Sequence, residues 1–329
     1  MSMGKFLIRR LLMALPVLLL IIFVSFVVIR ATPGGPFDMV GEGRRVPQAV
    51  IDGLNRQYGL DQPIMTQFVR YLGSLVRLDF GPSLGRSTLG EPVTEIIARG
   101  LPVSMQVGLF SVILGFSLGI PLGVLAAIYH NTIIDYTATF IAVLGTSIPN
   151  LVLGPVLIII FAVTLNWLPV ADVRGVWRST ITNPGVIFTW DYISLAILPV
   201  FALGTGMVAG IARLTRASLL QVMREDYIRT ARAKGLKERA VIYGHALKNA
   251  LIPVATILGP LLAAVLTGSF IIERIFNIPG IGDEFVASVA SRDYNLLVGV
   301  TIVYSVFLIA GNILVDVMYT WLDPRIRFD

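Results

Sequence analysis

The sequence predicts an all-α integral membrane protein with six transmembrane helices. Of its 329 residues, 55% are hydrophobic and only 14% are charged, which leaves too little polar surface to cover a soluble globule of this size. Runs of roughly 20 apolar residues, the length of helix that crosses about 30 Å of hydrocarbon, recur along the chain. Six such spans would place both termini on the same side of the membrane.

The first apolar run follows Lys5, Arg9 and Arg10, and a secretory signal peptide also begins with basic residues. This run is longer than the apolar core of a signal peptide and no A-x-A cleavage pattern follows it, so we expect a retained helix. The six expected spans cover approximately residues 11–29, 105–128, 136–165, 194–214, 251–272 and 296–322.

Basic residues are unevenly distributed between the two sides of these spans. If the N-terminus is cytoplasmic, 14 of the 26 lysines and arginines lie on the cytoplasmic side, and all four lysines are among them. Most of the others lie in residues 30–102, a segment long enough to be translocated largely regardless of charge. We therefore expect both termini in the cytoplasm. The net charge of +6 follows from this topology without a nucleic acid partner.

Two of the three outer segments contain signals for local structure. Residues 31–102 have apolar side chains at helical spacing over 47–58 and 64–78, which predicts a small helical insertion after the first span. Residues 273–294 contain the Asn-Ile-Pro-Gly-Ile-Gly stretch at 277–282, which predicts a sharp turn that dips back towards the pore. The remaining outer segment, residues 166–192, carries three tryptophans.

These tryptophans are Trp167, Trp177 and Trp190. Because indole rings favour the membrane interface, we expect them to anchor the outer ends of the flanking spans. In the second span, glycines recur every four residues and share one helix face, which predicts close packing against a neighbouring helix. They are Gly115, Gly119 and Gly123.

Two other spans carry polar residues that indicate either a packing contact or the lining of a polar path. Ser147 and Asn150 flank Pro149, which removes a backbone hydrogen bond and predicts a kink, and Thr205 lies between two glycines in the fourth span. Both interpretations stay open, and Ser147, Asn150 and Thr205 are the candidate pore-lining residues. The spans lack charged residues near their middles, apart from Asp316 towards the inner end of the sixth, which disfavours an ion-driven carrier.

Catalytic motifs are nearly absent from the sequence. The chain contains no cysteine, and its two histidines, His130 and His245, belong to no H-E-x-x-H zinc pattern. It also lacks the G-x-S-x-G nucleophile turn and the G-x-x-x-x-G-K-[ST] loop that cradles phosphates. We therefore expect a protein that is not an enzyme, holds no cofactor of its own and does not bind ATP in that way.

The most polar segment between two spans is 224–248, whose 25 residues include seven basic and three acidic side chains. Glu225 and Asp226 stand where a helix would begin, basic residues follow, and Gly235 stands where it would end. Small side chains that would allow a partner to approach this helix closely are Thr230, Ala231 and Ala233. A second helix, at about 237–249, should lead into the fifth span.

The order of residues in this segment resembles the EAA-type cytoplasmic loop of ABC importer permeases, specifically of their peptide and nickel branch. The likeness rests on DYIRTARAKGL at 226–236 and HALKNALIP at 245–253. It extends along the chain through DFGPS at 79–83, SIP at 147–149, IERIFNIPGIG at 272–282, RDY at 292–294 and LDPRIR at 322–327. Among these permeases the sequence most resembles the B-type subunit of dipeptide or oligopeptide importers.

The resemblance implies the type I ABC importer permease fold with an extracytoplasmic helical insertion after the first helix. It divides the chain into 1–30 (N-terminus and first span), 31–102 (insertion), 103–322 (permease core, with the coupling loop 219–250) and 323–329 (cytoplasmic tail). It also implies a bacterial plasma (inner) membrane protein that spans the membrane several times.

The implied partners are a related C-type permease subunit, two cytoplasmic ABC ATPase subunits that bind ATP and Mg, an extracytoplasmic solute-binding protein, membrane lipid and a peptide substrate. Nickel, heme and other solutes stay open as substrates. The residues expected to couple to the ATPase are Glu225, Asp226, Tyr227, Arg229, Thr230, Ala231, Arg232, Ala233, Lys234 and Gly235. The expected contacts with the binding protein are Asn277, Pro279 and Gly280.

Two functions from other classes are less well supported by the residues. A secondary carrier would explain the basic loop by topology alone, but it would need charged residues inside the spans. An intramembrane hydrolase would need paired catalytic groups, which the sequence does not indicate.

Overall fold

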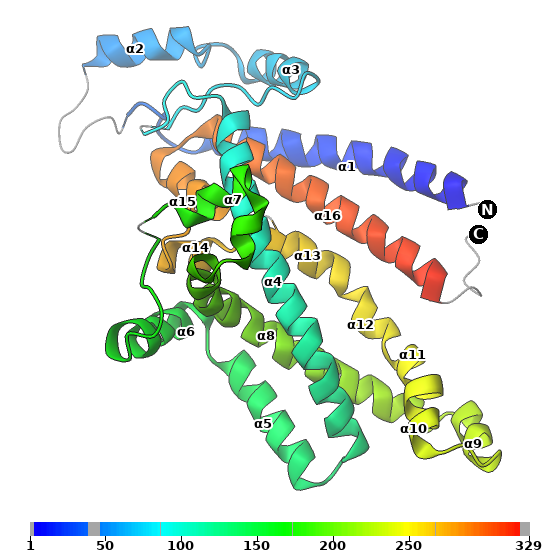
Figure 1. Cartoon of the computed structure of the whole chain (residues 1–329). Coiled ribbons are helices and arrows are strands. Elements are labelled where there is room, and N and C mark those ends of the chain that lie inside the picture. The colour runs from blue at the N-terminus through cyan, green and yellow to red at the C-terminus, as the bar shows by residue number, and fades with distance from the viewer. Residues whose placement is uncertain (1–2, 39–46, 86, 173, 267, 323–329) are drawn as a thin grey trace.

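Helices dominate the computed structural model, which describes residues 3–38, 47–85, 87–172, 174–266 and 268–322 (Figure 1). Its α-helices are α1 (Met3–Ala31), α2 (Gln48–Gln57), α3 (Ile64–Leu75), α4 (Val93–Ile128), α5 (Ile133–Ser147), α6 (Asn150–Leu157), α7 (Val176–Thr182), α8 (Trp190–Val222), α9 (Asp226–Ala233), α10 (Glu238–Ala240), α11 (Leu247–Ala250), α12 (Ile252–Thr256), α13 (Leu258–Leu266), α14 (Phe270–Ile275), α15 (Ile281–Ser291) and α16 (Tyr294–Leu322). Two π-helices, η1 (Ile158–Thr164) and η3 (Val241–Ala246), and one 3-10 helix, η2 (Pro184–Phe188), complete the described part. The predicted tail 323–329 lies outside the described residues.

The all-α membrane class is confirmed. Five described helices are long and apolar enough to cross a membrane, and there are six if the bent pair formed by α5 with α6 and η1 is one span. The kink expected within 136–165 is present and is sharp, because the chain bends by 99° between Ser147 and Asn150. Pro149 stands at this break and cannot donate a backbone hydrogen bond, so the helix ends instead of bending gently.

Two other span boundaries differ from the sequence prediction. α4 begins at Val93, twelve residues before the expected start, because its first turns are buried against α16 through contacts such as Ile96 and Ile97 with Leu296. The fifth span ends at about Leu266 and not at 272, because Gly268 adopts a φ of +99° that no continuing helix allows. α14 is consequently a separate short helix beyond the span.

α4 and α8 pack closely through the glycine face predicted for the second span. Ideal Cβ atoms built on Gly115 and Gly119 would lie 2.9 Å from Met207 Cβ and 2.8 Å from Ile211 Cβ. One built on Gly123 would lie 2.5 Å from the Ala212 carbonyl oxygen. These separations are too short for a real side chain, so the glycines set the distance between the two helices.

Gly123→Ala should therefore destabilise the protein, whereas Gly210→Ala should not. The added methyl group at position 123 would push α8 away, at a cost of roughly 1–3 kcal/mol. Gly210, on α8 itself, has nothing within 4 Å of an ideal Cβ, and alanine there should be neutral or slightly stabilising. Thermal unfolding in detergent measures both, and equal midpoints for the two variants would contradict the close-packing assignment.

The segment after α1 forms the helical insertion that the sequence predicts. α2 and α3 lie at the C-terminal end of α1, near the start of α16, and α1 runs beside α16 (Figure 1). Ile22 and Phe26 of α1 pack with Tyr71 of α3 and with Val298 and Ile302 of α16. α1 exposes much of its remaining apolar surface, for example Leu12 and Leu20, each 62% exposed, which suits contact with lipid.

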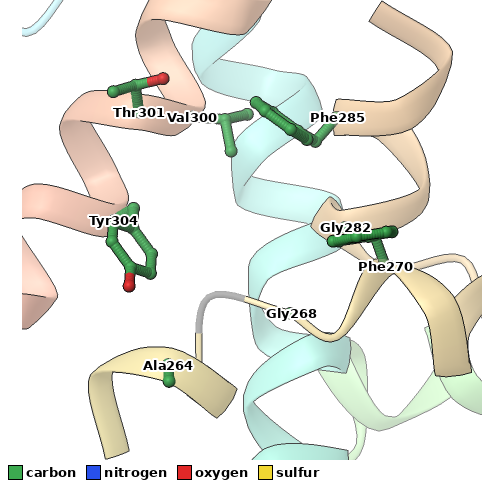
Figure 2. A pocket seen from close by; sticks show the side chains of 8 residues that line it. All are labelled: Ala264, Gly268, Phe270, Gly282, Phe285, Val300, Thr301 and Tyr304. Carbon is green, nitrogen blue, oxygen red and sulfur yellow. The ribbon is translucent and has the colours of Figure 1, made fainter. Parts of the chain in front are cut away.

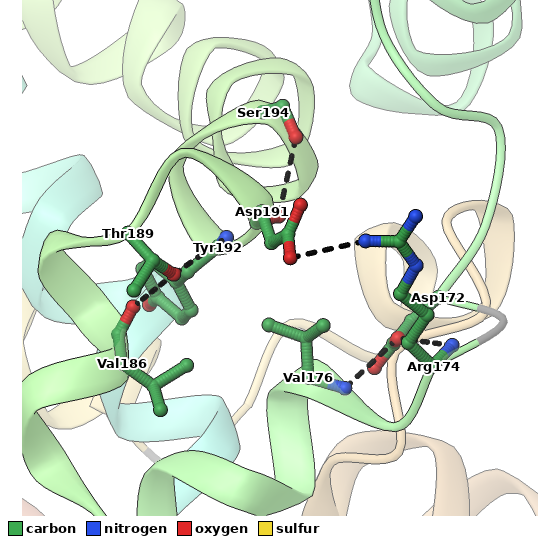
Figure 3. A network of polar contacts seen from close by, with 8 residues as sticks. All are labelled: Asp172, Arg174, Val176, Val186, Thr189, Asp191, Tyr192 and Ser194. Carbon is green, nitrogen blue, oxygen red and sulfur yellow. Dashed lines mark hydrogen bonds and ion pairs between the residues drawn. The ribbon is translucent and has the colours of Figure 1, made fainter.

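A polar network shapes the outer segment before α8 (Figure 3). The Asp172 carboxylate accepts hydrogen bonds from the backbone nitrogens of Val176 (2.9 Å) and Trp177 (2.8 Å) and so caps α7. Arg174 pairs with Asp191 at 3.1 Å, tying this loop to the first turn of α8.

This arrangement corrects one prediction about the tryptophans. Trp167 and Trp190 are 67% and 66% exposed, as interface anchors would be, but Trp177 is only 1% exposed. Its ring packs edge-on against Tyr192 at 5.1 Å between centroids. The cap on α7 turns this ring into the core, so Trp177 is a packing residue and not a membrane anchor.

Candidate functional site

The helix predicted within the polar segment 224–248 is present as α9. Glu225 is its N-cap residue, Asp226 lies in its first turn and Arg232 in its last, so both charges complement the helix dipole. Gly235 has a φ of +78°, a conformation that ends helices and favours glycine. The sequence signals for the beginning and end of this helix therefore correspond to its actual bounds.

One face of α9 packs on the chain's own helices. Ile228 is fully buried and Ala231 is 7% exposed. Both belong to an apolar cluster that includes Val124 of α4, Leu219 of α8 and Val241 of η3. A displacement of α9 must therefore move the inner ends of these helices with it, because the cluster is close-packed. Ile228 lies outside the set of residues predicted to couple to a partner, whereas Ala231 belongs to that set but packs inwards.

Polar side chains at the flanks of α9 hold it in a fixed orientation. Arg232 makes two hydrogen bonds to the Glu238 carboxylate, at 2.7 and 3.1 Å, and thereby joins α9 to α10. This pairing raises the pKa of Arg232 above its usual value. On the other side, Asn249 Nδ2 donates to the Tyr227 hydroxyl at 2.7 Å. Tyr227 and Arg232, both predicted to contact a partner, thus also hold α9 in place through hydrogen bonds within the chain.

The remaining face of α9 is open. Asp226, Arg229, Thr230 and Ala233 are exposed and lie on the side of the helix opposite Ile228 and Ala231. We call these four residues the free face. Among the described residues, the ion-pair partner of Arg229 is Asp226, at 3.3 Å within the same helix, and the Thr230 hydroxyl donates to the Asp226 carbonyl oxygen. Glu225, Lys234 and Gly235 are also exposed at the two ends.

The outer turn at 277–282 is sharp, as the sequence predicts. Asn277 is exposed and has a φ of +51°. Pro279 is half-buried, whereas Gly280 is buried, because Glu273 lies directly against it. Of the three residues predicted to contact a binding protein, Gly280 thus has the least accessible surface.

Glu273, which is not among the residues predicted from the sequence, organises this turn. The carboxyl group is 1% exposed, and its Oε2 accepts hydrogen bonds from the backbone nitrogens of Gly282 (2.8 Å) and Asp283 (3.1 Å) at the start of α15. The Ser104 hydroxyl of α4 bonds to it as well. Burial nevertheless raises the pKa of Glu273 to about 7, although these hydrogen bonds lower it.

This raised pKa predicts a dependence of stability on pH. The unfolded carboxyl has a pKa of about 4.5, so between about pH 4.5 and 7 the folded protein binds more protons than the unfolded chain. The free energy of unfolding should therefore fall by about 2–3 kcal/mol as the pH rises through this range. Thermal unfolding measured from pH 4.5 to 8 tests this. Glu273→Gln should remove the fall in stability with rising pH, whereas the control Glu95→Gln, at an exposed carboxylate, should keep it. The same fall in Glu273→Gln as in the unmodified protein would show that Glu273 is not its source.

The candidate pore residues lie near the break after α5. Ser147 is the last residue of α5 and Asn150 is the first of α6. Thr205 of α8 packs against Gly145 of α5, since an ideal Cβ built on Gly145 would lie 3.0 Å from Thr205 Cγ2. The Thr205 hydroxyl donates to the Phe201 carbonyl oxygen at 2.6 Å. The structure thus brings all three residues to one region.

A cavity of about 330 Å³ lies between α13, the α14–α15 turn and α16 (Figure 2). Phe270 and Phe285 line one side, and Tyr304 projects from α16 towards Ala264 on the other. The lining contains no charged side chain. Thr301 and Tyr304 are the lining residues with side-chain hydroxyl groups. Among the described residues, no group of three or more His, Asp or Glu side chains could hold a metal ion.

Sequence comparisons relate the whole chain to transport proteins. Residues 119–328 match the family described as binding-protein-dependent transport system inner membrane component, and residues 3–108 match the family of its N-terminal part. The chain is 42% identical over 325 residues to the dipeptide transport system permease protein DppB of Bacillus subtilis, covering 99% of this chain and 98% of the relative. It is 41% identical over 326 residues to the oligopeptide transport system permease protein OppB of Salmonella typhimurium, covering 99% and 100%.

A solved structure shares the fold. An inward-facing chain of the MetNI methionine ABC transporter aligns with a TM-score of 0.52 and 20% identity, covering 70% of this chain and 99% of that chain. This likeness supports the type I importer permease architecture expected from the sequence.

Proposed function

Because this chain belongs to the family of binding-protein-dependent transport system inner membrane components, we propose that it is one of two permease subunits through which an ATP-driven importer moves peptides. It is a transport subunit and not an enzyme. The proposed peptide substrate rests on relatives named as dipeptide and oligopeptide permeases, which match nearly the full length of the chain.

The observation that carries the coupling role is the division of α9 into two faces. Ile228 and Ala231 join it to the inner ends of α4 and α8, while the free face is turned to solvent. A partner docked on that face could displace α9, and the displacement would pass to the spans through the apolar cluster. We assign this docking position to one of two cytoplasmic ABC ATPase subunits, which bind ATP and Mg. This places both termini and α9 in the cytoplasm.

The other partners follow from the same proposal. A related C-type permease would complete the translocation path, with Ser147, Asn150 and Thr205 as the proposed polar lining. A solute-binding protein would deliver peptide to the opposite side and contact Asn277 and Pro279. The uncharged cavity in Figure 2 supports leaving peptide selection mainly to that binding protein.

Reconstitution tests this function. The chain, its paired permease and two ATPase subunits would be placed in proteoliposomes loaded with ATP, with the binding protein and a labelled dipeptide outside. We expect uptake that requires ATP and all subunits. Uptake by this chain alone, driven by an ion gradient without ATP, would instead identify a secondary carrier.

A further inference from the structure

Arg30, at the outer end of α1, has an unusual environment. Its guanidinium carbon lies 3.5 Å from the centre of the Phe26 ring, and its Nε donates to Gln67 Oε1 at 2.9 Å. Its Nη1 is buried and finds no hydrogen-bond partner among the residues that the structure describes. No carboxylate of the described residues forms an ion pair with this side chain. Arg30 as a whole is half-buried, but a cation with a buried, unpaired donor atom is costly, so such groups are normally matched by a counter-ion.

A second unpaired polar group lines the same space. Tyr71 of α3 is 7% exposed, and within the described part of the chain its buried hydroxyl has no hydrogen-bond partner. Burial raises the pKa of Tyr71 above its usual value, so the hydroxyl keeps its proton and can donate. Arg30 and Tyr71 both line a cavity of about 220 Å³, which we call the outer pocket, together with the exposed Arg70.

The charges of the outer pocket favour an anion. Arg30 and Arg70 contribute two positive charges, and Asp79 contributes one negative charge at the exposed rim. The Asp79 Oδ1 already accepts a hydrogen bond from the Gly81 backbone nitrogen at 2.8 Å. The interior is therefore cationic and rich in donors, a combination that suits phosphate oxygens.

The position of the outer pocket places it at the level of lipid headgroups. The apolar helix Leu7–Ala31 is 25 residues long, about 37 Å, which exceeds the roughly 30 Å of hydrocarbon, and Arg30 stands in its last turn. On the face opposite the residues that line the outer pocket, α3 exposes the apolar side chains of Met65 (58%) and Val69 (67%), and its C-cap residue Val76 is 86% exposed. Such an exposed apolar face is typical of a helix lying in the membrane interface.

We propose that the outer pocket, between α1, α3 and the start of α16, is a binding site for a phosphate group, with Arg30 and Tyr71 as its principal ligands. The phosphate belongs either to a phospholipid headgroup or to free inorganic phosphate. Binding would supply partners for Arg30 Nη1 and the Tyr71 hydroxyl and would fasten the insertion to α1. This site is independent of the transport function proposed above.

The test uses the full-length chain, delipidated in detergent together with any subunits that accompany it. Its unfolding midpoint is measured against increasing short-chain phosphatidylethanolamine, inorganic phosphate or acetate, because a ligand of the native state raises the midpoint. Arg30→Gln should weaken the apparent affinity for the phosphate ligand by about 10- to 100-fold, and Tyr71→Phe by about 3- to 10-fold. Arg77→Gln, an exposed arginine outside the outer pocket, is the matched control and should bind normally.

The two sources give different outcomes. A response to phosphatidylethanolamine at far lower concentration than to inorganic phosphate would identify a lipid site, and an equal or stronger response to inorganic phosphate would identify a free anion. For each variant, the unfolding midpoint with ligand is compared with the midpoint of the same variant without ligand. If Arg30→Gln fails to fold, Tyr71→Phe still tests the proposal. The proposal is overturned if neither phosphate ligand binds, if acetate binds as well, or if the pocket variants respond like Arg77→Gln.

Discussion

Ala233→Trp is expected to reduce ATP-driven uptake by about tenfold or more while leaving the protein folded and inserted. Ala233 lies on the free face of α9, so the indole ring would project into the space of a docked ATPase without touching the apolar cluster. A bulky side chain at the centre of a small contact typically costs enough affinity for an effect of this size. Uptake in proteoliposomes and co-purification of the ATPase measure the two consequences.

Two substitutions define the controls for this prediction. Ala49→Trp places the same side chain on exposed α2, remote from α9, and should leave uptake unchanged. Ala231→Trp would not be a useful alternative, because Ala231 is 7% exposed and tryptophan there would disrupt the packing of α9 on its own chain. Normal uptake and normal ATPase binding in Ala233→Trp would show that the free face is not the docking surface.

Local signals in the sequence were sufficient to define α9, but not to orient it. An acidic start and Gly235 at the end gave its bounds because dipole and capping effects act within one turn. Which of the small residues of α9 is buried depends on the helices that pack against it, α4 and α8, and these come from distant parts of the chain. Hence Ala231 was assigned to the partner surface although it packs against α4 and α8.

The same limit explains the buried carboxylates that the sequence analysis overlooked. Glu273 stands in a segment that reads as an outer loop, and only its contact with Ser104 of α4 and the start of α15 shows that it is buried. The break after α5 was partly predictable, since Pro149 indicated a kink. Its angle of 99° was not, because helix direction beyond a proline is set by tertiary packing.

Asp135 and Arg216 form a contact that is separated by 81 residues in the sequence. Arg216 Nε and Nη2 of α8 each donate to an oxygen of the Asp135 carboxylate of α5, both at 2.6 Å. The Asn131 backbone nitrogen donates to the same carboxylate at 2.9 Å. The pair joins α5 to α8 about two turns before α8 ends next to α9. It therefore keeps α5 attached to the helices that α9 would move.

Arg216→Gln should destabilise the protein by about 3–5 kcal/mol, more than Asp135→Asn at about 1–3 kcal/mol. The difference arises because the Asp135 side chain is only 2% exposed and would stay buried without its cation, whereas the Arg216 side chain is 32% exposed and could reach water. The double variant Asp135→Leu with Arg216→Met should recover most of the loss, since it leaves no unpaired charge. Unfolding midpoints in detergent measure all three. A larger loss for Asp135→Asn than for Arg216→Gln would mean that burial of the carboxylate does not set the energetics of this pair.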